Sequence, residues 1–443
     1  MLFTSSPLWK VSGQEFSELL TSQDRLQPFA APGRRLHASW RAHSVRDLDP
    51  VTSFLSPGIQ LFQRKNIRSP PGSIGKHEMG INGTGMRLLI DCSLSLINRT
   101  GAHYISEDLT AAFADRAILR RWRLLTQQLP SGILRKIFGR LMVQEIALLG
   151  TSSSLLWPEP RAAKLKRLFL DPLYVSRSRL ESSDIVLCHD IGPLSHPELY
   201  DRGTVDAYGK AYQKIAAAQP GMVFVSKGSQ LAFEARFGTA FRFLRTVSLY
   251  VRTGSVSGPS EPIPEVQRPF FLTVGALETR KNQKTAIEAF ERYGFAQRGL
   301  SYILCGANGA GAEEIQATAA RTPGVKVLGY VSDAQLRWLY REASAFVLPS
   351  LLEGFGMPAL EAALHGLVPI LSQDSALSEA VNGAALQVDP HSVPEIGAAM
   401  ESVLALDEGR RSELKDALIL HAQSATRERF LAQWEDLISS ELH

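Results

Sequence analysis

In most of the chain, short apolar runs alternate with stretches whose apolar positions follow the period of a helix. Residues 87–91, 184–188 and 221–226 are apolar over the length of a buried strand. After the last of these runs, Ser226 is suited to cap a helix that ends at Gly238. Alternation of this kind predicts a parallel sheet with helices on both faces.

The second half of the chain shows the same alternation more clearly. One of its helical segments, 286–293, keeps one face apolar, and another begins with a capping box at Ser332 and Gln335. The strands between the helices are expected at 270–274, 302–305, 325–328, 345–348, 368–371 and 385–388. The pattern predicts an α/β protein with two Rossmann-like, doubly wound domains, whose strand ends face a cleft where ligands bind.

Changes in composition divide the chain. Residues 1–85 contain scattered Pro and Gly but no strand-length apolar run, which predicts a poorly ordered, removable N-terminal extension. A small docking domain is the alternative. The Rossmann-like domains are expected at 86–251 and 269–424, joined by a Gly/Ser/Pro-rich linker at 252–268. Residues 425–443 have the pattern of a charged amphipathic helix that could pack back on the first domain.

The overall composition excludes several classes of protein. Hydrophobic residues make up 44% and charged residues 21%, which is typical of a globular chain. Lys plus Arg number 48 against 44 Asp plus Glu, a balance that does not favour a nucleic-acid partner. No run reaches the roughly 18 apolar residues of a membrane span, and no secretory signal is visible. The three cysteines form no CxxC pair, so we expect a soluble, cytoplasmic protein without structural zinc.

The strongest chemical signal is the segment SLLEGFGMPALEA at 350–362, which directly follows a predicted strand. Its glycines allow a tight turn close to a ligand, and Pro358 suits the first turn of a helix. The free N–H groups of that helix would suit a diphosphate. Glu353 and Glu361 bracket this position and could accept hydrogen bonds from paired sugar hydroxyls. The alternative is a loop with one solvated glutamate and one glutamate that stabilises the helix dipole.

This segment resembles the donor-site motif of family-4-type (group 1) retaining glycosyltransferases with the GT-B fold, and is similar to bacterial mannosyltransferases of polysaccharide synthesis. Adjoining segments agree with this resemblance. Residues 273–282 look like the family's strand–Gly–Arg-Lys-Asn turn, 188–194 like its His-Asp turn, and 98–104 like its Gly-rich first loop. The resemblance extends from about residue 86 to the C-terminus and is more specific in the second domain.

The resemblance implies a role for each matching residue. Arg280 and Lys281 would neutralise the donor diphosphate, and Glu361 would bind the ribose hydroxyls. Glu353 would bind the transferred sugar, while His189 would approach that sugar from the other domain. His189, Glu353 and Lys281 would thus take part in catalysis. Further donor or acceptor contacts would come from Gly354, Phe355, Gly356 and Gly101.

Alternatives remain open for several of these residues. Arg280 and Lys281 could be a solvated pair at a helix start, and His189 could be a packed or capping residue. The loop at Gly101 could be a plain turn. At Ala276 some relatives carry a basic residue instead, so the phosphates could rely on the Arg-Lys pair alone.

Two patterns suggest other chemistry and are set aside. Asp47 and Asp49 have the spacing of a metal-binding Asp-x-Asp pair, but they lie in the expected extension among polar residues. We therefore expect neither a metal nor another cofactor. The glycine-rich run 306–311 follows a strand but lacks the G-x-G-x-x-G spacing of a dinucleotide site, which predicts a plain strand–helix turn.

The resemblance and the residues together predict a retaining glycosyltransferase. It would move a hexose, with mannose from GDP-mannose favoured, from a nucleotide-diphosphate sugar to a glycan or lipid-linked acceptor in polysaccharide biosynthesis. A catalytically silent GT-B-like binding or scaffold subunit is the alternative, and the missing fingerprint disfavours a dinucleotide-dependent oxidoreductase.

The stretch 114–141 predicts a further partner. It carries many Arg and Lys residues and a single Asp, interleaved with Trp122, Ile133, Leu134, Ile137 and Phe138. Basic amphipathic stretches of this type lie on anionic lipid head groups, so peripheral contact with the inner face of the cell membrane is expected. A solvated helix face that packs on its own sheet is the alternative.

Overall fold

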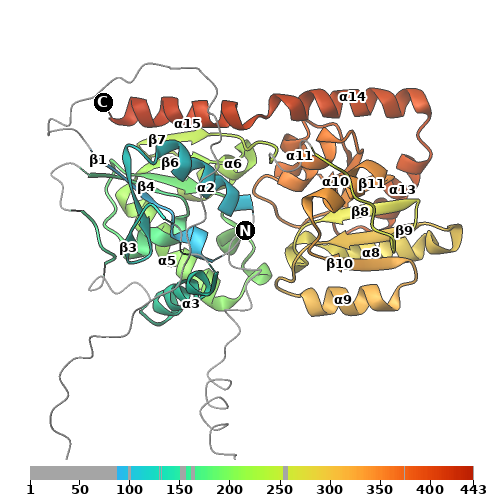
Figure 1. Ribbon diagram of the computed structural model, residues 1–443, viewed down its shortest axis with the longest axis horizontal. Helices are drawn as coiled ribbons and strands as arrows, with labels where there is room; N and C mark the ends of the chain where they lie inside the picture. The colour runs from blue at the N-terminus through green and yellow to red at the C-terminus, as the bar shows by residue number, and fades with distance from the viewer. Residues whose placement is uncertain are drawn as a thin grey trace, which may run out of the picture. The chain divides into compact units, whose positions relative to one another are not determined.

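The computed structural model describes residues 87–97, 101–128, 130, 132–149, 156–160, 165–252, 258–373 and 375–442. The expected extension 1–85, with Asp47 and Asp49, lies outside these residues. All described residues belong to one compact unit. Within it, the strands form two separate sheets (Figure 1).

The first sheet has the strand order β3-β2-β1-β4-β5-β6-β7. Its strands are β1 (Arg87–Asp91), β2 (Ala117–Arg121), β3 (Leu124–Leu125), β4 (Leu165–Phe169), β5 (Ile185–Cys188), β6 (Gly221–Phe224) and β7 (Phe243–Thr246). Neighbouring strands are parallel except β2 and β3, which form a short antiparallel edge. Parallel strands need crossover segments, and helices therefore connect most of them.

These helices cover both faces of the first sheet. They are α2 (Gly101–Phe113), α3 (Gly132–Leu149), α5 (Arg202–Ala218) and α6 (Lys227–Phe237), with short turns η3 (Ser93–Leu96), η4 (Pro172–Arg177), α4 (Gly192–Ser195) and η5 (Pro197–Leu199). The apolar side chains of α2 pack on one face, and those of α3, α5 and α6 on the other. The predicted cap of α6 is confirmed, since the Ser226 side chain accepts from the Ser229 N–H and Gly238 ends the helix.

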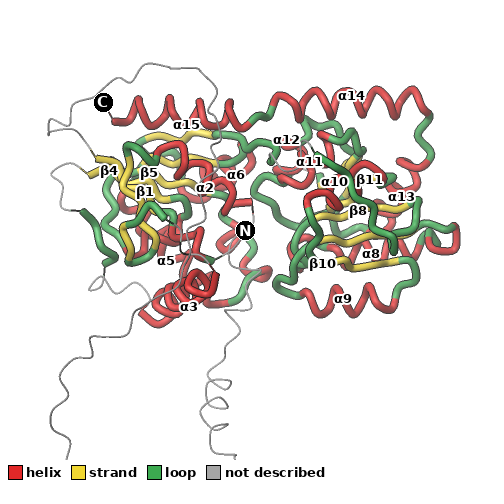
Figure 2. The backbone as a smooth tube through the Cα atoms, viewed as in Figure 1, coloured by secondary structure: helices red, strands yellow, loops and turns green. Residues whose placement is uncertain are grey.

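The second sheet has the order β10-β9-β8-β11-β12-β13 and is parallel throughout (Figure 2). Its strands are β8 (Phe270–Val274), β9 (Ser301–Cys305), β10 (Val325–Gly329), β11 (Ala345–Leu348), β12 (Pro369–Ser372) and β13 (Leu386–Val388). The central strands β8, β9, β11 and β12 are buried along their whole length. Their continuous apolar runs are what burial on both faces requires.

Two helical layers enclose this second sheet. The elements are η6 (Thr279–Lys281), α8 (Gln283–Arg292), η7 (Ala296–Arg298), α9 (Ala312–Arg321), α10 (Asp333–Glu342), α11 (Met357–Leu364), α12 (Ala376–Ala380), α13 (Val393–Leu404) and α14 (Glu408–Ser424). One face packs against α10, α11, α12 and α14, and the other against α8, α9 and α13. The predicted capping box is confirmed at the start of α10, where Ser332 and Gln335 exchange both hydrogen bonds.

The last helix, α15 (Arg427–Leu442), packs on elements of the first sheet (Figure 1). The ring of Phe430 lies 4.8 Å from that of Tyr250, and the Glu441 carboxylate pairs with Lys166 of β4 and with Arg242. The predicted C-terminal helix, α15, therefore packs back on the domain that contains the first sheet.

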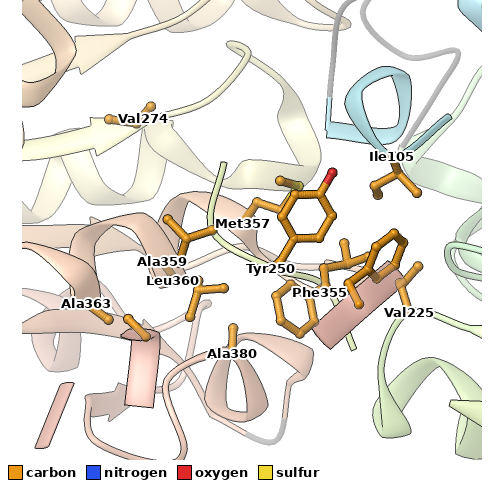
Figure 3. Packing of buried hydrophobic residues seen from close by; sticks show 14 of the residues in the cluster. Ile105, Val225, Tyr250, Val274, Phe355, Met357, Ala359, Leu360, Ala363 and Ala380 are labelled. Carbon is orange, nitrogen blue, oxygen red and sulfur yellow. The ribbon is translucent and has the colours of Figure 1, made fainter. Parts of the chain in front are cut away.

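One apolar cluster joins the carboxyl ends of the two sheets. Figure 3 shows Ile105 of α2 and Val225 near Phe355 and Met357 at the start of α11, with Tyr250 among them. All five side chains are buried. This apolar layer places the start of α11 next to elements of the first sheet.

Candidate active site

Strand ends of both sheets border one cavity of about 250 Å³. From the first sheet it is lined by the start of α2 and by His189, which directly follows β5. From the second sheet it is lined by the residues after β8, β9 and β10 and by the turn that begins α11. This is the position at which open parallel sheets bind ligands.

The turn between β11 and α11 brings backbone N–H groups to this cavity. Gly356 has φ +98°, a conformation that glycine adopts readily, and Pro358 lies in the first turn of α11. A side chain at Gly354 would collide with the backbone oxygen of His189. Ser226 and Ser229 also donate to the Gly354 carbonyl, over 2.6 and 3.0 Å. Glycine at 354 therefore lets the turn lie against the first domain.

Behind this turn lies a buried cluster of charged side chains. The Lys281 Nζ is 2.5 Å from Glu353 Oε1, and the Arg280 Nη1 is 3.4 Å from Glu353 Oε2. Glu278 pairs with Arg280 over 2.7 Å, and Ser350 donates to Glu353 over 3.1 Å. Two carboxylates and two cations thus balance one another.

Burial and pairing oppose each other in this cluster. Burial disfavours the charge of Glu353, but Lys281 and Arg280 outweigh it and lower the pKa of this carboxyl. Burial likewise disfavours the charged Arg280, whereas Glu278 and Glu353 raise its pKa. The alternative that Arg280 and Lys281 are a solvated pair is wrong, because their side chains are only 4% and 6% exposed.

The Arg-Lys-Asn turn is held by its asparagine. Asn282 adopts a left-handed conformation, φ 57°, and its side-chain amide donates to the carbonyls of Pro349 and Pro390 over 3.0 and 2.6 Å. These carbonyls lie after β11 and after β13. The asparagine therefore fixes the cation-bearing turn relative to the turn that carries Glu353.

The second glutamate of the motif, Glu361, lies on α11 and lines the cavity. Its carboxylate accepts from Arg252 Nε and, over 2.9 Å, from Arg252 Nη2. The Tyr340 hydroxyl donates to the same carboxylate over 3.1 Å. The Arg252 guanidinium also lies over the Tyr104 ring, 5.4 Å from its centre. Glu361 and Glu353 therefore lie in separate ion-pair groups.

His189 is buried but lines the cavity. Burial lowers its pKa to about 4, which keeps the imidazole neutral at neutral pH. Its Nε2 lies 3.1 Å from the Leu170 carbonyl, and a carbonyl requires a donor there. In this tautomer Nδ1 is an acceptor, so His189 suits a hydroxyl of a ligand rather than its phosphate.

The remaining residues predicted from the sequence differ in whether they are among the described residues and in whether they line the cavity. Gly101 lines the cavity at the start of α2, next to Met357, whereas residues 98–100 of the same loop lie outside the described residues. Phe355 is buried in the apolar cluster and also borders the cavity. Ala276 lines the cavity as well and brings no charge to it.

Several of these neighbours were not expected from the sequence. Glu278, Tyr340 and Arg252 come from separate elements, and no local spacing links them to the two glutamates. Glu379 accepts from the backbone N–H groups of Lys227 and Gly228, and so caps α6 from the opposite domain. Glu278 lies within the family-like segment 273–282, but the resemblance assigns it no role.

The patterns set aside in the sequence behave as ordinary structure. The run 306–311 is the turn between β9 and α9. Within the described ranges, no group of three or more His, Cys, Asp or Glu side chains could hold a metal ion. The cysteines are buried and free. Across the same ranges, no helix has the length and apolar character needed to cross a membrane.

The basic stretch 114–141 is not a single amphipathic element, and the structure corrects the prediction in part. Arg120 and Arg121 belong to β2 and are buried, where they pair with Asp91 and Glu107. Most of the stretch's large apolar side chains in solvent lie on α3, where Ile133, Leu134, Ile137 and Leu141 are 73%, 54%, 43% and 45% exposed. At the β3 edge, Leu124 and Leu125 are 36% and 43% exposed.

Comparison with known sequences finds one matching family. Residues 260–419 match the family of glycosyl transferases group 1. The O-antigen chain mannosyltransferase B of Escherichia coli is 28% identical over 290 residues, which are 61% of this chain and 76% of that protein. The serotype-specific mannosyltransferase WbdA of E. coli is 32% identical over 160 residues, 33% of this chain but only 18% of WbdA.

Solved structures share the fold at low identity. Sucrose-phosphate synthase from Thermosynechococcus elongatus aligns with a TM-score of 0.58 and 17% identity, over 80% of this chain and 98% of that one. A UDP-forming trehalose-phosphate synthase from Burkholderia xenovorans aligns with a TM-score of 0.57 and 14% identity, over 81% and 98%. The predicted family resemblance and the GT-B fold class are thereby confirmed.

Proposed function

We propose, from the premise that residues 260–419 belong to the group 1 glycosyltransferases on a GT-B fold, that this enzyme is a retaining hexosyltransferase. It transfers a hexose from a nucleotide-diphosphate sugar to a glycan or lipid-linked acceptor in polysaccharide synthesis. Mannose from GDP-mannose is the favoured donor, because the similar E. coli proteins carry the name mannosyltransferase. The observation that carries the proposal is the buried Lys281–Glu353–Arg280 cluster beside the start of α11.

The chemistry follows from where charge develops. When the bond from the sugar's anomeric carbon to the diphosphate breaks, the bonding electrons and a negative charge leave with the phosphate. The N–H groups at the start of α11 and the cations of Arg280 and Lys281 stabilise that charge, so no metal or other cofactor is required. An acceptor oxygen forms the new bond on the same face of the sugar and gives its proton to the departing phosphate.

The other residues orient the donor. Glu361 binds ribose hydroxyls, and the backbone of 354–356 with Glu353 binds the sugar. His189, neutral because it is buried, accepts a hydrogen bond from a sugar hydroxyl through Nδ1. These contacts fix the anomeric carbon relative to both the leaving phosphate and the acceptor, which lowers the entropic part of the barrier.

A thermal-shift panel of GDP, UDP, ADP and NAD tests this assignment. One nucleoside diphosphate should raise the melting temperature, since a ligand that binds only the folded state stabilises it, whereas NAD should not. Lys281→Met should reduce that shift. Lys284→Met is the matched control, because Lys284 lies one turn away and is 46% exposed in a pair with Glu314.

A transfer assay then completes the test. With GDP-mannose and a mannose-containing glycan, the product should keep the anomeric configuration of the donor, as proton NMR of the new linkage would show. A protein that binds no nucleoside diphosphate, or binds one without transferring sugar, would instead be a scaffold subunit.

We further propose that the enzyme is cytoplasmic and makes peripheral contact with an anionic membrane through α3. The support is the run of exposed apolar side chains on this helix, together with the exposed Lys136 and Arg140. Apolar side chains next to cations are the pattern of helices that lie in a lipid interface. A lipid-linked acceptor would also be found at such a surface.

Liposome flotation with and without phosphatidylglycerol tests the membrane contact. The wild-type protein should float only with the anionic vesicles. The double variant Ile133→Asp/Ile137→Asp should stay in the lower fractions. Leu420→Asp is the matched control, because Leu420 is 72% exposed on α14 and far from α3 in sequence. Equal flotation with both vesicle types, or no effect of the α3 variant, would refute the contact.

A further inference from the structure

The carboxylate of Glu361 has little capacity left for a ligand. An ionised carboxylate offers about four lone-pair positions. Two of them are used by Nε and Nη2 of Arg252 and a third by the Tyr340 hydroxyl. Only one position then remains, whereas the paired hydroxyls of a ribose need two. Binding of both hydroxyls at Glu361 therefore requires Arg252 to give up at least one of its hydrogen bonds.

The cations assigned to the diphosphate are also already paired. Arg280 and Lys281 neutralise Glu278 and Glu353 in the buried cluster, which carries no excess positive charge. Arg252 is the third cation that lines the cavity, and its side chain is 23% exposed against 4% and 6% for the other two. Because it is the least buried, it can change partners at the lowest desolvation cost.

From its position beside Glu361, the Arg252 guanidinium would have to move only a short distance to reach the phosphates. In a nucleotide, the first phosphate is attached to the same ribose that carries the hydroxyls. A guanidinium displaced from Glu361 by these hydroxyls therefore lies close to the phosphates. The Tyr104 ring, 5.4 Å away, provides a second contact that keeps the guanidinium at the cavity. A guanidinium also matches a phosphate in the same two-pronged geometry with which it now binds the carboxylate.

We propose that Arg252 is a donor-binding residue that exchanges Glu361 for the diphosphate when the nucleotide sugar binds. The inference rests on the proposed function and adds to it a residue that no motif in the sequence indicates. Ribose hydroxyls take the place of the guanidinium on Glu361, and the released guanidinium neutralises the phosphates. Arg252 thereby supplies the uncompensated cation that neither Arg280 nor Lys281 provides.

Calorimetry with paired probes tests this exchange. GDP and UDP carry the diphosphate, and guanosine and uridine are the same nucleosides without it. For the pair that the wild type binds, Arg252→Met should weaken the diphosphate by about 10- to 100-fold, the effect of one charged hydrogen-bonding partner. Nucleoside affinity should stay equal or rise, because the Glu361 carboxylate no longer has to be released.

Two further variants guard the interpretation. Arg252→Lys keeps the positive charge and should retain more of the diphosphate affinity than Arg252→Met, even if the methionine variant folds poorly. Arg116→Met removes an arginine from an exposed pair with Glu435 and should change neither affinity.

Each remaining outcome overturns the inference. An equal loss of diphosphate and nucleoside affinity would mean that Arg252 only orients Glu361. A gain in diphosphate affinity would mean that Arg252 only obstructs the site, and no change would mean that it has no part in binding. In these cases the proposed function stands, because the wild type still binds the diphosphate. If the wild type binds none of the probes, the proposed function fails together with the inference.

Discussion

The buried pair of Lys281 and Glu353 gives the most direct test of how the buried cluster of charged side chains is built. Replacing Glu353 by Gln keeps the shape of the side chain but removes one negative charge. Lys281 then loses the carboxylate with which it pairs, whereas Arg280 keeps Glu278 and the more distant Asp190. The cluster then carries one uncompensated positive charge among side chains that are at most 6% exposed. Lys281→Met produces the opposite imbalance.

The expected cost follows from this burial. Removing one partner of a buried ion pair typically costs about 3–5 kcal/mol, because the other charge stays buried without compensation. Arg280, 3.4 Å from Glu353, and Ser350 remain as partial partners, so we expect about 3 kcal/mol for each single variant. The double variant restores the balance of charge and should cost about as much as one single variant.

Urea unfolding of the wild type, both single variants and the double variant measures this coupling. Their free energies of unfolding should give an interaction energy of about 2–3 kcal/mol between Lys281 and Glu353. If the effects of the two substitutions add within about 0.5 kcal/mol, the two residues are not coupled in solution, and the description of Lys281 and Glu353 as a buried ion pair is wrong. In the same Glu353→Gln protein, GDP or UDP affinity should be undiminished while sugar transfer falls, because the proposed function assigns Glu353 to the sugar and not to the nucleotide.

Three further predictions concern pH, the domain contact and metal independence. Burial lowers the pKa of His189 from 6.5 to about 4, so between these pH values the unfolded chain binds a proton that the folded protein does not. The free energy of unfolding should therefore decrease as the pH is lowered through this window, by up to about 3 kcal/mol from this residue. His189→Gln should reduce the slope of the urea midpoint against pH, measured from pH 7.5 to 4.5. Parallel slopes for the wild type and the variant would contradict the assignment. Glu379→Gln removes a carboxylate that caps α6 and should cost about 0.5–1 kcal/mol in urea unfolding, whereas an unchanged midpoint would show that the cap is not formed in solution. Sugar transfer should persist in excess EDTA, and a loss restored by Mg²⁺ or Mn²⁺ would refute transfer without a metal.

The α/β pattern and the family resemblance were sufficient to predict the fold class, but not every strand. Local sequence was enough to predict strands β8, β9 and β11, because each is a continuous apolar run that is buried on both faces. Strands β2 and β4 were not identified, since each contains buried charges. Arg120 pairs with Asp91 on the neighbouring strand, and Lys166 pairs with Glu441 of α15. A charge in a strand looks like solvent exposure until its partner, distant in sequence, is known.

The candidate site divides in the same way. Arg280, Lys281, Glu353 and Glu361 could be named in advance, because glycines and a proline place them at local turns next to strand ends. The partners of Glu361, Arg252 and the Tyr340 hydroxyl, could not be named, because tertiary contacts alone bring them to this carboxylate. The basic stretch 114–141 was misjudged for the same reason, since two of its seven basic residues, Arg120 and Arg121, are buried in β2 and paired there. Glu278 lies only two residues before its partner Arg280, but no motif gives it a role.

The turn at Gly354 connects these observations to the reaction. Its carbonyl accepts from Ser226 of the first domain, and the single hydroxyl proton of Ser229 is shared between this carbonyl and that of His189, 2.9 Å away. Residues that would bind the transferred sugar therefore also lie where the two domains meet. A change in the angle between the domains must move His189 relative to Glu353. Such coupling would make sugar transfer, more than nucleotide binding, depend on closure of the domains, because the ribose and diphosphate contacts lie mainly in the second domain.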